Sequence, residues 1–223
     1  MKTIILGPPG TGKTTALLEL VENYLGRGIS PSKIGYFAFT KKAANEALQR
    51  AMKQFNLSED DLPYFRTLHS LAFRRLGIKK ENVMQRKHYV DLGNKINMRI
   101  DYNEYDEEQT GIFTTHSDYL RVIQLAQLRG ITPEQQYNLR EHSQDLSVRD
   151  LKILDGELKA YKKQYGLIDF NDMITQFIKS DVCPKFDTVF IDEAQDLSRM
   201  QWDMATALMF NAEDSFIAGD DDQ

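Results

Sequence analysis

The chain has 223 residues, of which 41% are hydrophobic and 27% are charged, and its formal net charge is −5. This is the balance of an ordinary globular protein, long enough to bury a sizeable core. The single cysteine, Cys183, excludes an internal disulfide framework and a cysteine-based zinc site. No apolar run approaches the roughly 18 residues of a membrane span, and no signal peptide fits ahead of the first strand, so we expect a cytoplasmic protein without membrane contact.

The first predicted elements are a buried strand over residues 2–7 and a helix from Lys13 to about Leu25. The strand is expected to be buried because it contains a continuous apolar run, IIL. Between the two elements, residues 7–14 read GPPGTGKT. This sequence fits the phosphate-binding loop G-x-x-x-x-G-K-[ST] in its required strand–loop–helix context.

Glycines in such a loop let backbone N–H groups converge on a phosphate, and the helix that follows adds its positive N-terminal end. Lys13 is expected to reach the β- and γ-phosphates, and the Thr14 hydroxyl to ligate Mg²⁺. We therefore predict a nucleoside triphosphate site; the alternative is a glycine-rich turn that merely joins a strand to a helix. The candidate binding residues are Gly7, Pro8, Pro9, Gly10, Thr11, Gly12, Lys13, Thr14 and Thr15.

A second strand is predicted over residues 34–39, followed by a helix over 41–55 with Thr40 as its N-cap. After a polar break, a short strand over 64–67 and a helix over 69–76 come next. Alternating strands and helices indicate a parallel sheet with right-handed crossover helices.

Residues 79–165 have a different character. Their apolar residues recur at helical spacing, no convincing strand is found, and an acidic segment over 101–109 is predicted to be a loop. We expect an all-helical subdomain inserted between two parts of an α/β domain, residues 1–78 and 166–223.

The α/β pattern then resumes. A helix is predicted over residues 169–179, a strand over 187–191, a helix capped by Ser198 that runs to about Phe210, and a last strand over 215–218.

Two adjacent carboxylates, Asp192 and Glu193, follow the apolar strand over 187–191. A phosphate-loop NTPase needs an acid at the tip of a neighbouring strand to hold Mg²⁺, and a second carboxylate can deprotonate the attacking water. Asp192 fits the first role and Glu193 the second, that of general base. The alternative is a strand that ends in solvated acids.

Five further segments carry a family resemblance. FAFTKKAANE (37–46) is similar to TFTNKAAxEM, RTLHS (66–70) to GTFHS, DEAQD (192–196) to DExQD and GDDDQ (219–223) to GDxxQ, with a looser match of GLIDF (166–170) to GLVDF. These motifs, in this order, resemble those of superfamily 1 DNA helicases of the UvrD/Rep/PcrA type. The resemblance spans essentially the whole chain.

The resemblance implies the first RecA-like domain of an ATP-dependent DNA helicase, a P-loop NTPase with a parallel β-sheet flanked by helices and a helical insert. Such a domain hydrolyses ATP with Mg²⁺ and binds single-stranded DNA and ss/dsDNA junctions, with movement in the 3′→5′ direction. By motif position, Gln195 and Gln223 are implied near the γ-phosphate, where Gln223 joins Lys13 and Glu193 in catalysis. The implied DNA-binding residues are Phe39, Thr40, Lys41, Thr67 and His69.

The residues support part of this DNA path independently. Thr40 and Thr67 follow predicted strands, so both should lie at the carboxyl edge of the sheet, where ligands bind. An exposed Phe39 or His69 can stack a base, although Phe39 can equally be a core aromatic. Nine Lys and Arg residues against two acids lie between Arg66 and Arg99. They form either a nucleic-acid contact or a solvated helix face.

Three features depart from the family pattern. The usual adenine-contacting segment is not found ahead of Gly7, so ATP is implied by the resemblance alone. Lys41 stands where Asn is usual and can add a phosphate contact. The second RecA-like domain, with its arginine finger, does not follow Gln223. We therefore expect the N-terminal part of a helicase, either truncated or half of a split protein, with weak activity alone. A nucleotide-switched binding module that is not a motor, and an RNA-directed relative, remain as alternatives.

Overall fold

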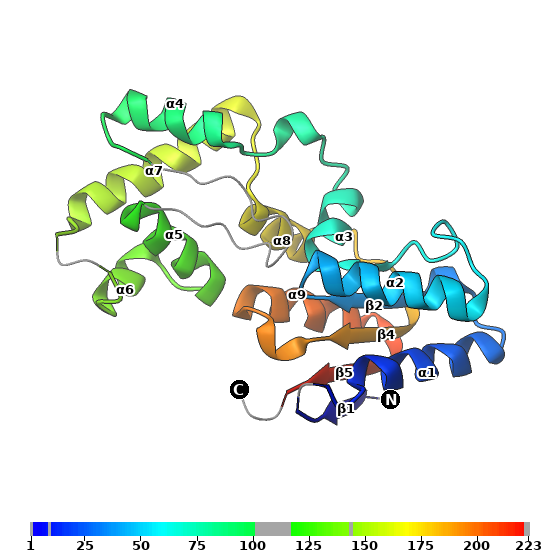
Figure 1. Ribbon diagram of the computed structural model, residues 1–223. Coiled ribbons are helices and arrows are strands. Elements are labelled where there is room, and N and C mark those ends of the chain that lie inside the picture. The colour runs from blue at the N-terminus through cyan, green and yellow to red at the C-terminus, as the bar shows by residue number, and fades with distance from the viewer. Residues whose placement is uncertain (1, 9, 101–116, 143–144, 221–223) are drawn as a thin grey trace.

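The computed structural model describes residues 2–8, 10–100, 117–142 and 145–220. In this part of the chain five strands form one sheet in the order β1-β5-β4-β2-β3, and every neighbouring pair is parallel (Figure 1). The strands are β1 (Lys2–Leu6), β2 (Ile34–Ala38), β3 (Phe65–Thr67), β4 (Phe186–Asp192) and β5 (Ala212–Gly219). The predicted α/β class with a parallel sheet is confirmed.

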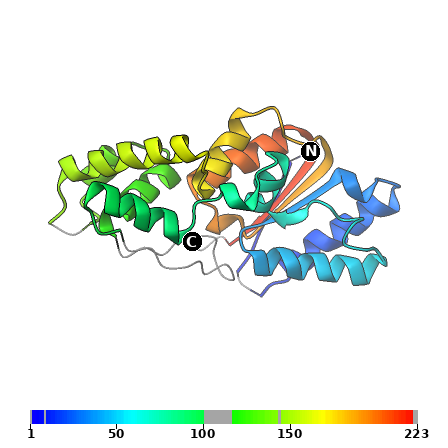
Figure 2. The same ribbon diagram turned by 90° about the horizontal axis from the view of Figure 1, so that it is seen from above.

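Helices cover both faces of the sheet (Figure 2). One face carries α1 (Lys13–Gly26) and α2 (Lys41–Phe55), and the other carries α3 (Leu68–Arg75), α8 (Phe170–Lys179) and α9 (Arg199–Phe210). Every residue of β2 is buried, as is nearly every residue of β4. Strands buried on both faces read as continuous apolar runs, which is why these two were recognisable in the sequence.

Aromatic rings fill much of the core under α1 and α2. Tyr36 and Phe65 stack with their ring centroids 5.1 Å apart, and Phe190 and Phe216 do the same at 5.1 Å. These rings lie on neighbouring strands, so their packing joins four strands of the sheet across one face. Offset stacking of this kind contributes about 0.5–1.5 kcal/mol per pair beyond the buried area.

The predicted N-caps of α2 and α9 are confirmed. The Thr40 hydroxyl accepts a hydrogen bond from the Ala43 N–H at 3.0 Å, and the Ser198 hydroxyl accepts one from the Gln201 N–H at 3.3 Å. Each cap satisfies a backbone donor that the first turn of a helix leaves free, at a gain of about 1 kcal/mol. The caps therefore fix where both helices begin.

The expectation that the first strand is buried is wrong. In β1 the side chains of Ile4 and Leu6 are 65% and 62% exposed. The cause is the place of β1 in the sheet, because it pairs only with β5 and lies at the edge. An apolar run predicts a strand here but does not say how many neighbours that strand has.

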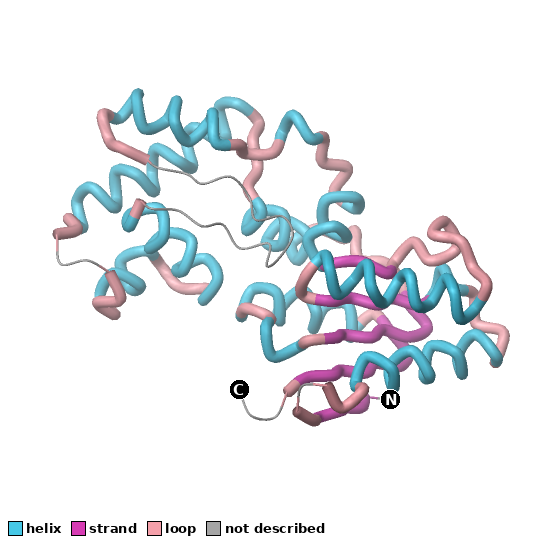
Figure 3. The backbone as a smooth tube through the Cα atoms, viewed as in Figure 1, coloured by secondary structure: helices cyan, strands magenta, loops and turns pink. Residues whose placement is uncertain are grey.

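The middle of the chain forms a helical unit with a core of its own (Figure 3). Its helices are α4 (Arg86–Ile96), α5 (Asp118–Arg129), α6 (Pro133–Asn138) and α7 (Val148–Tyr165). The predicted helical character is confirmed for these residues, whereas the predicted loop over 101–109 lies outside the described part. No helix among the described residues is long and apolar enough to cross a membrane.

Helix α6 was not predicted as a separate element. Its start is marked by Thr132, whose hydroxyl accepts from the Gln135 N–H at 3.2 Å while the Gln135 side chain accepts from the Thr132 N–H at 2.8 Å. Pro133 occupies the first helical position. This capping box is a sequence signal that could have located the helix.

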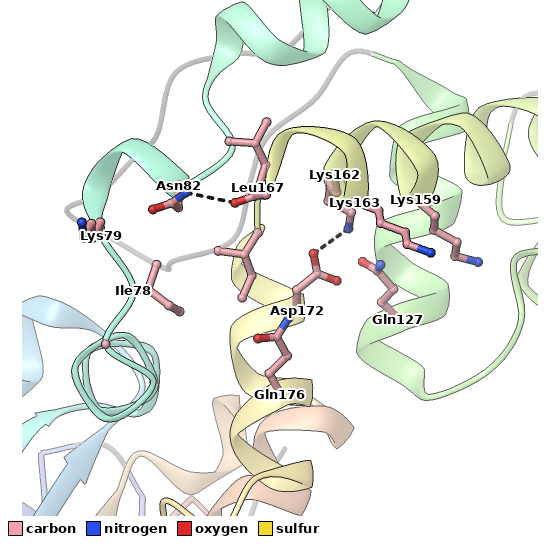
Figure 4. A pocket seen from close by; sticks show the side chains of 13 residues that line it. Ile78, Lys79, Asn82, Gln127, Lys159, Lys162, Lys163, Leu167, Asp172 and Gln176 are labelled. Carbon is pink, nitrogen blue, oxygen red and sulfur yellow. Dashed lines mark hydrogen bonds and ion pairs between the residues drawn. The ribbon is translucent and has the colours of Figure 1, made fainter.

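The helical unit joins the α/β part through two chain segments that run side by side. The Met84 N–H donates to the Ile168 carbonyl at 2.9 Å, and the Ile168 N–H donates to the Asn82 carbonyl at 2.8 Å. Beside them lies a pocket of about 680 Å³, lined by residues of α7, α8 and the entering segment (Figure 4). The two connections are therefore held to each other rather than independent.

A buried ion-pair cluster lies at the same junction. The side chain of Lys162, at the end of α7, is 8% exposed, and its ammonium donates to Asp169 Oδ2 at 2.7 Å and Asp172 Oδ2 at 2.6 Å. Both carboxylates belong to the start of α8, where Asp169 is the N-cap. Burial acts to lower the pKa of Lys162, but the two negative charges outweigh it and raise that pKa.

Candidate nucleotide and DNA site

The candidate nucleotide-binding residues gather at one edge of the sheet, where the carboxyl ends of β1, β5 and β4 lie next to one another. The Gly7 N–H donates to the Gly219 carbonyl at 3.3 Å, which ties the start of the loop to the end of β5. Ligands of open α/β sheets bind outside this edge. Segments from both ends of the chain therefore meet where a ligand is expected.

The loop between β1 and α1 has a backbone that requires glycine. Gly10 and Gly12 have φ angles of +78° and +85°, in the left-handed region that side chains with a Cβ disfavour. Gly12 is the N-cap of α1 and has no side chain that could cap the helix. The first N–H groups of α1 are thus not capped by that residue's side chain, which suits the binding of an anion.

Lys13 is folded back across this loop. Its ammonium donates to the Gly7 carbonyl at 2.6 Å and the Pro8 carbonyl at 3.1 Å, and it also forms an ion pair with Asp220. The side chain of Lys13 is only 9% exposed. The other predicted residues of the loop lie around it, with Thr15 exposed in the first turn of α1 and Pro9 outside the described residues.

Asp192, at the tip of β4, accepts three hydrogen bonds. It is 2% exposed, and its Oδ2 accepts from the Thr14 hydroxyl at 2.9 Å and from the Tyr36 hydroxyl at 2.6 Å. Its Oδ1 accepts from the Glu193 N–H at 3.0 Å. Burial, followed by the charge of Asp192, raises the pKa of Tyr36 well above its ordinary value, so the phenol keeps the proton that it donates.

The contact between Thr14 and Asp192 fits a magnesium site. Mg²⁺ prefers hard oxygen ligands and is usually held by one or two protein groups, with phosphates and water completing its shell. A hydroxyl and a carboxylate within 2.9 Å supply such a pair. No group of three or more His, Cys, Asp or Glu side chains suited to a metal occurs in the described residues, so a cage made only of such residues is not formed there.

Glu193 is held by a network rather than left in solvent. Its backbone has φ +52°, an uncommon value for a residue with a side chain, and its carboxylate accepts from the Gln195 amide at 2.7 Å. The side-chain oxygen of the same amide, Gln195 Oε1, accepts in turn from the Asp220 N–H at 3.1 Å. The structure therefore brings Glu193 and Gln195 together, whereas Gln223 lies outside the described residues.

Two residues of this site were missed by sequence reasoning. Tyr36 was recognised only as part of an apolar strand, although β2 pairs with β4 and Tyr36 reaches the carboxylate of Asp192. Asp220 was included in a motif without a role. Its place in GDDDQ was a signal, but nothing in the sequence shows that β5 lies next to β1 and carries Asp220 to Lys13.

Thr40 and Thr67 lie together at the carboxyl ends of β2 and β3, as predicted. Each hydroxyl already accepts a backbone hydrogen bond as an N-cap, Thr40 from Ala43 at 3.0 Å and Thr67 from Ser70 at 3.2 Å. A hydroxyl that accepts in this way still has its own hydrogen to donate. Both can therefore offer a donor to a phosphate oxygen, and Lys41 is exposed at the start of α2.

The two predicted stacking residues are less open than expected. Phe39 is 9% exposed and belongs to the core under α3, α8 and α9, which agrees with the core alternative and not with an exposed stacking surface. His69 is half-buried, with its ring 5.8 Å from that of Phe170. Burial lowers the pKa of His69 to about 4, so the ring is neutral at neutral pH.

The basic residues between Arg66 and Arg99 differ in burial and in the partners that they bind. Arg66 is half-buried, and burial, followed by the charge of Arg74, lowers its pKa to about 10. Arg75 donates to the Val182 carbonyl at 2.9 Å, and Lys95 pairs with Asp91 at 2.9 Å. Some members of the cluster thus have structural partners, and a nucleic-acid role for the cluster stays a prediction.

The parallel sheet and the loop and acidic residues at its edge define a RecA-like fold of the phosphate-loop class. A family model described as the UvrD/REP helicase N-terminal domain matches residues 1–223. The chain belongs to this family, which confirms the resemblance drawn from the motifs.

Curated relatives with similar sequences are helicases. A probable DNA helicase of Mycoplasma pneumoniae is 26% identical over 245 residues, which cover 99% of this chain and 44% of that protein. The ATP-dependent DNA helicase srs2 of Schizosaccharomyces pombe is 26% identical over 257 residues, covering 99% of this chain and 28% of the relative. The ATP-dependent DNA helicase PcrA of Bacillus subtilis is 24% identical over 240 residues, covering 99% and 31%. The chain thus spans less than half the length of these relatives.

Proposed function

We propose that this chain binds and hydrolyses ATP with Mg²⁺ and binds single-stranded DNA, as the N-terminal motor domain of a helicase that moves 3′→5′ and unwinds ss/dsDNA junctions. The observation that carries the proposal is the Thr14 hydroxyl 2.9 Å from the Asp192 carboxylate. It joins the phosphate-binding loop to the acidic strand tip as a nucleotide and metal site requires. Two relatives named above are ATP-dependent helicases, which supports ATP as the nucleotide.

Each residue of the site has a distinct task in this proposal. The loop backbone and Lys13 bind the phosphates, and Thr14 and Asp192 hold Mg²⁺, which neutralises charge on the phosphates. Tyr36 fixes the orientation of Asp192 through its 2.6 Å hydrogen bond. Glu193 accepts the proton of the attacking water.

Gln195 positions Glu193, to which its amide donates at 2.7 Å. The roles of Pro9 and Gln223 rest on the family resemblance.

The proposed DNA path runs along the carboxyl ends of β2 and β3. Thr40 and Thr67 donate their hydroxyl hydrogens to phosphate oxygens, and Lys41 adds a charge. Contacts of this kind hold a strand without reading its sequence. His69 takes part as a neutral ring, and Phe39 supports the path from the core.

We also propose that the chain is organised as an α/β domain in two parts, residues 1–78 and 166–223, with a helical subdomain over 79–165. The support is the separate core of the helical unit, which contains Tyr89 and Leu154 and is distinct from the two cores that flank the sheet.

The test is ATP turnover by residues 1–223 with and without single-stranded DNA. The proposal predicts slow turnover that depends on Mg²⁺ and responds to single-stranded DNA, and no unwinding by this segment alone. Lys41→Ala should weaken DNA binding and leave ATP binding unchanged, because Lys41 lies in the proposed DNA path. ATP binding with no response to DNA would favour the nucleotide-switched binding module. A preference for single-stranded RNA would favour the RNA-directed alternative.

A further inference from the structure

Asp220 is a buried carboxylate at the end of β5 to which the proposed function gives no task. Its side chain is 7% exposed and forms an ion pair with Lys13, whose side chain is 9% exposed. The Lys13 ammonium also donates to the Gly7 and Pro8 carbonyls, at 2.6 and 3.1 Å. An ammonium has three donors, so all three are engaged within the chain. A phosphate can bind Lys13 only if one of these contacts is given up.

The backbone of Asp220 is connected to the general base. The Asp220 N–H donates to the side-chain oxygen Oε1 of Gln195 at 3.1 Å, and Nε2 of the same side-chain amide donates to the Glu193 carboxylate at 2.7 Å. The neighbouring Gly219 keeps this contact close, because a Cβ there would lie 3.2 Å from the same Gln195 oxygen. A continuous set of contacts therefore runs from Lys13 through Asp220 and Gln195 to Glu193.

We propose that Asp220 is a positioning residue that holds Lys13 and competes with the nucleotide for it. When a phosphate takes the place of the Asp220 carboxylate on Lys13, the ion pair is lost and Asp220 can shift. Its backbone contact then transmits that shift to Gln195 and Glu193. Nucleotide binding at the loop in this way changes the position of the Glu193 carboxylate. The inference rests on the proposed function, since it assumes that the loop binds a nucleotide.

Competition between Asp220 and the nucleotide for Lys13 predicts the direction in which a substitution changes nucleotide affinity. When a ligand must displace an internal contact, its apparent affinity is lower than its intrinsic affinity. The reduction is set by the fraction of molecules in which that contact is already open. Asp220→Asn keeps the size of the side chain and the backbone N–H to Gln195. It replaces a charge-assisted hydrogen bond to Lys13 with a neutral one, which is roughly half as strong. We expect Asp220→Asn to bind ATP and ADP about tenfold more tightly.

Asp220→Asn also removes a negative charge near the bound polyphosphate, and this alone would favour binding even if Asp220 did not compete for Lys13. Asp196 supplies the control, because it is an exposed carboxylate close enough to Asp220 for the charge of Asp220 to contribute to its raised pKa, and no hydrogen bond or ion pair joins it to Lys13 among the described residues. Titration calorimetry with ATP and ADP in Mg²⁺ should show the large gain for Asp220→Asn and a small one for Asp196→Asn. Equal or weaker binding by Asp220→Asn, or an equal gain in both variants, would overturn the proposal.

A second experiment needs no nucleotide. In the unmodified protein Asp220→Asn should lower the melting temperature, because it weakens a buried ion pair. In a Lys13→Met background it should raise the melting temperature, because it removes a buried carboxylate that has lost its cation. The same sign in both backgrounds would refute the contact itself. Failure of the unmodified protein to bind ATP or ADP would instead refute the proposed function, so the two failures are distinguishable.

Discussion

Among single substitutions at the junction between the helical unit and the sheet, we expect Lys162→Met to lower the free energy of unfolding most. Met has a similar length and keeps the apolar stem of Lys162 packed. The ammonium is lost, however, and with it the contacts to Asp169 and Asp172 at 2.7 and 2.6 Å. Two carboxylates whose side chains are 7% and 28% exposed then face each other without a cation.

Removing one partner of a buried ion pair costs about 3–5 kcal/mol, because the remaining charge stays buried without compensation. Two carboxylates remain here, so we expect the upper part of that range, about 4–5 kcal/mol. Such a loss is a large fraction of the usual stability of a domain, about 5–15 kcal/mol. Adding Asp172→Asn to Lys162→Met should restore part of it, because one of the two opposed charges is removed.

The penalty should depend on pH. Burial and the charge of Asp169 already raise the pKa of Asp172 in the folded protein. A raised folded-state pKa contributes stability at low pH that is lost as the pH rises through it. Lys162→Met raises this pKa further, so the difference between variant and unmodified protein should be larger near pH 7 than near pH 5.

Urea unfolding at these two pH values measures the effect, with Lys159→Met as the control. Lys159 lies one turn earlier on α7, its side chain is 64% exposed, and its ion pair with Asp155 is a surface contact. Loss of such a contact costs about 0–1 kcal/mol. If Lys162→Met were no more destabilising than Lys159→Met, or equally destabilising at both pH values, the assignment of a buried charge cluster would be incorrect.

Three further outcomes are expected. Glu193→Gln should reduce ATP turnover by about 10²–10⁴-fold while nucleotide affinity stays within about threefold, because an amide cannot accept the proton; unchanged turnover would exclude Glu193 as the base. Tyr36→Phe should destabilise the protein by about 1–3 kcal/mol, since the buried Asp192 loses a donor, and should weaken Mg²⁺-dependent ATP binding; calorimetry at several Mg²⁺ concentrations checks this. Burial keeps His69 neutral, with a pKa of about 4. The ratio of the single-stranded DNA affinity of the unmodified protein to that of His69→Asn should therefore be constant between about pH 6 and pH 8. A rise of that ratio as the pH falls through about 6.5 would show a cationic contact.

The sheet and its helices could be predicted because their signals are local. The bounds predicted for α2 agree with the structure at both ends, since Thr40 caps it and its periodicity is strong. Apolar runs identified β2 and β4 for the same reason. The exposure of Ile4 and Leu6 was missed because it depends on strand order, which only the three-dimensional structure sets.

The same distinction between local signals and long-range contacts applies to the candidate site. Thr14, Asp192 and Glu193 were found because they belong to motifs with a defined spacing. Tyr36 and Asp220 were not found, because each acts through a contact with a strand distant in sequence.

The junction cluster around Lys162 was also missed, although the capping residue Asp169 marks the start of α8 in the sequence. A lysine in the last turn of a helix reads as solvated, and only the packing of α7 against α8 shows that it is buried.

The nucleotide site is tested most directly by the equilibrium binding of ATP in Mg²⁺ to the unmodified chain and to Lys13→Ala, with Lys53→Ala on the exposed surface of α2 as the control. Lys13 alone among these lysines lies within the phosphate-binding loop, with its ammonium 2.6 Å from the Gly7 carbonyl. We predict saturable binding by the unmodified chain and by Lys53→Ala, and an affinity at least tenfold lower in Lys13→Ala, a loss of about 1.4 kcal/mol or more. Equal affinity in all three proteins would contradict this prediction.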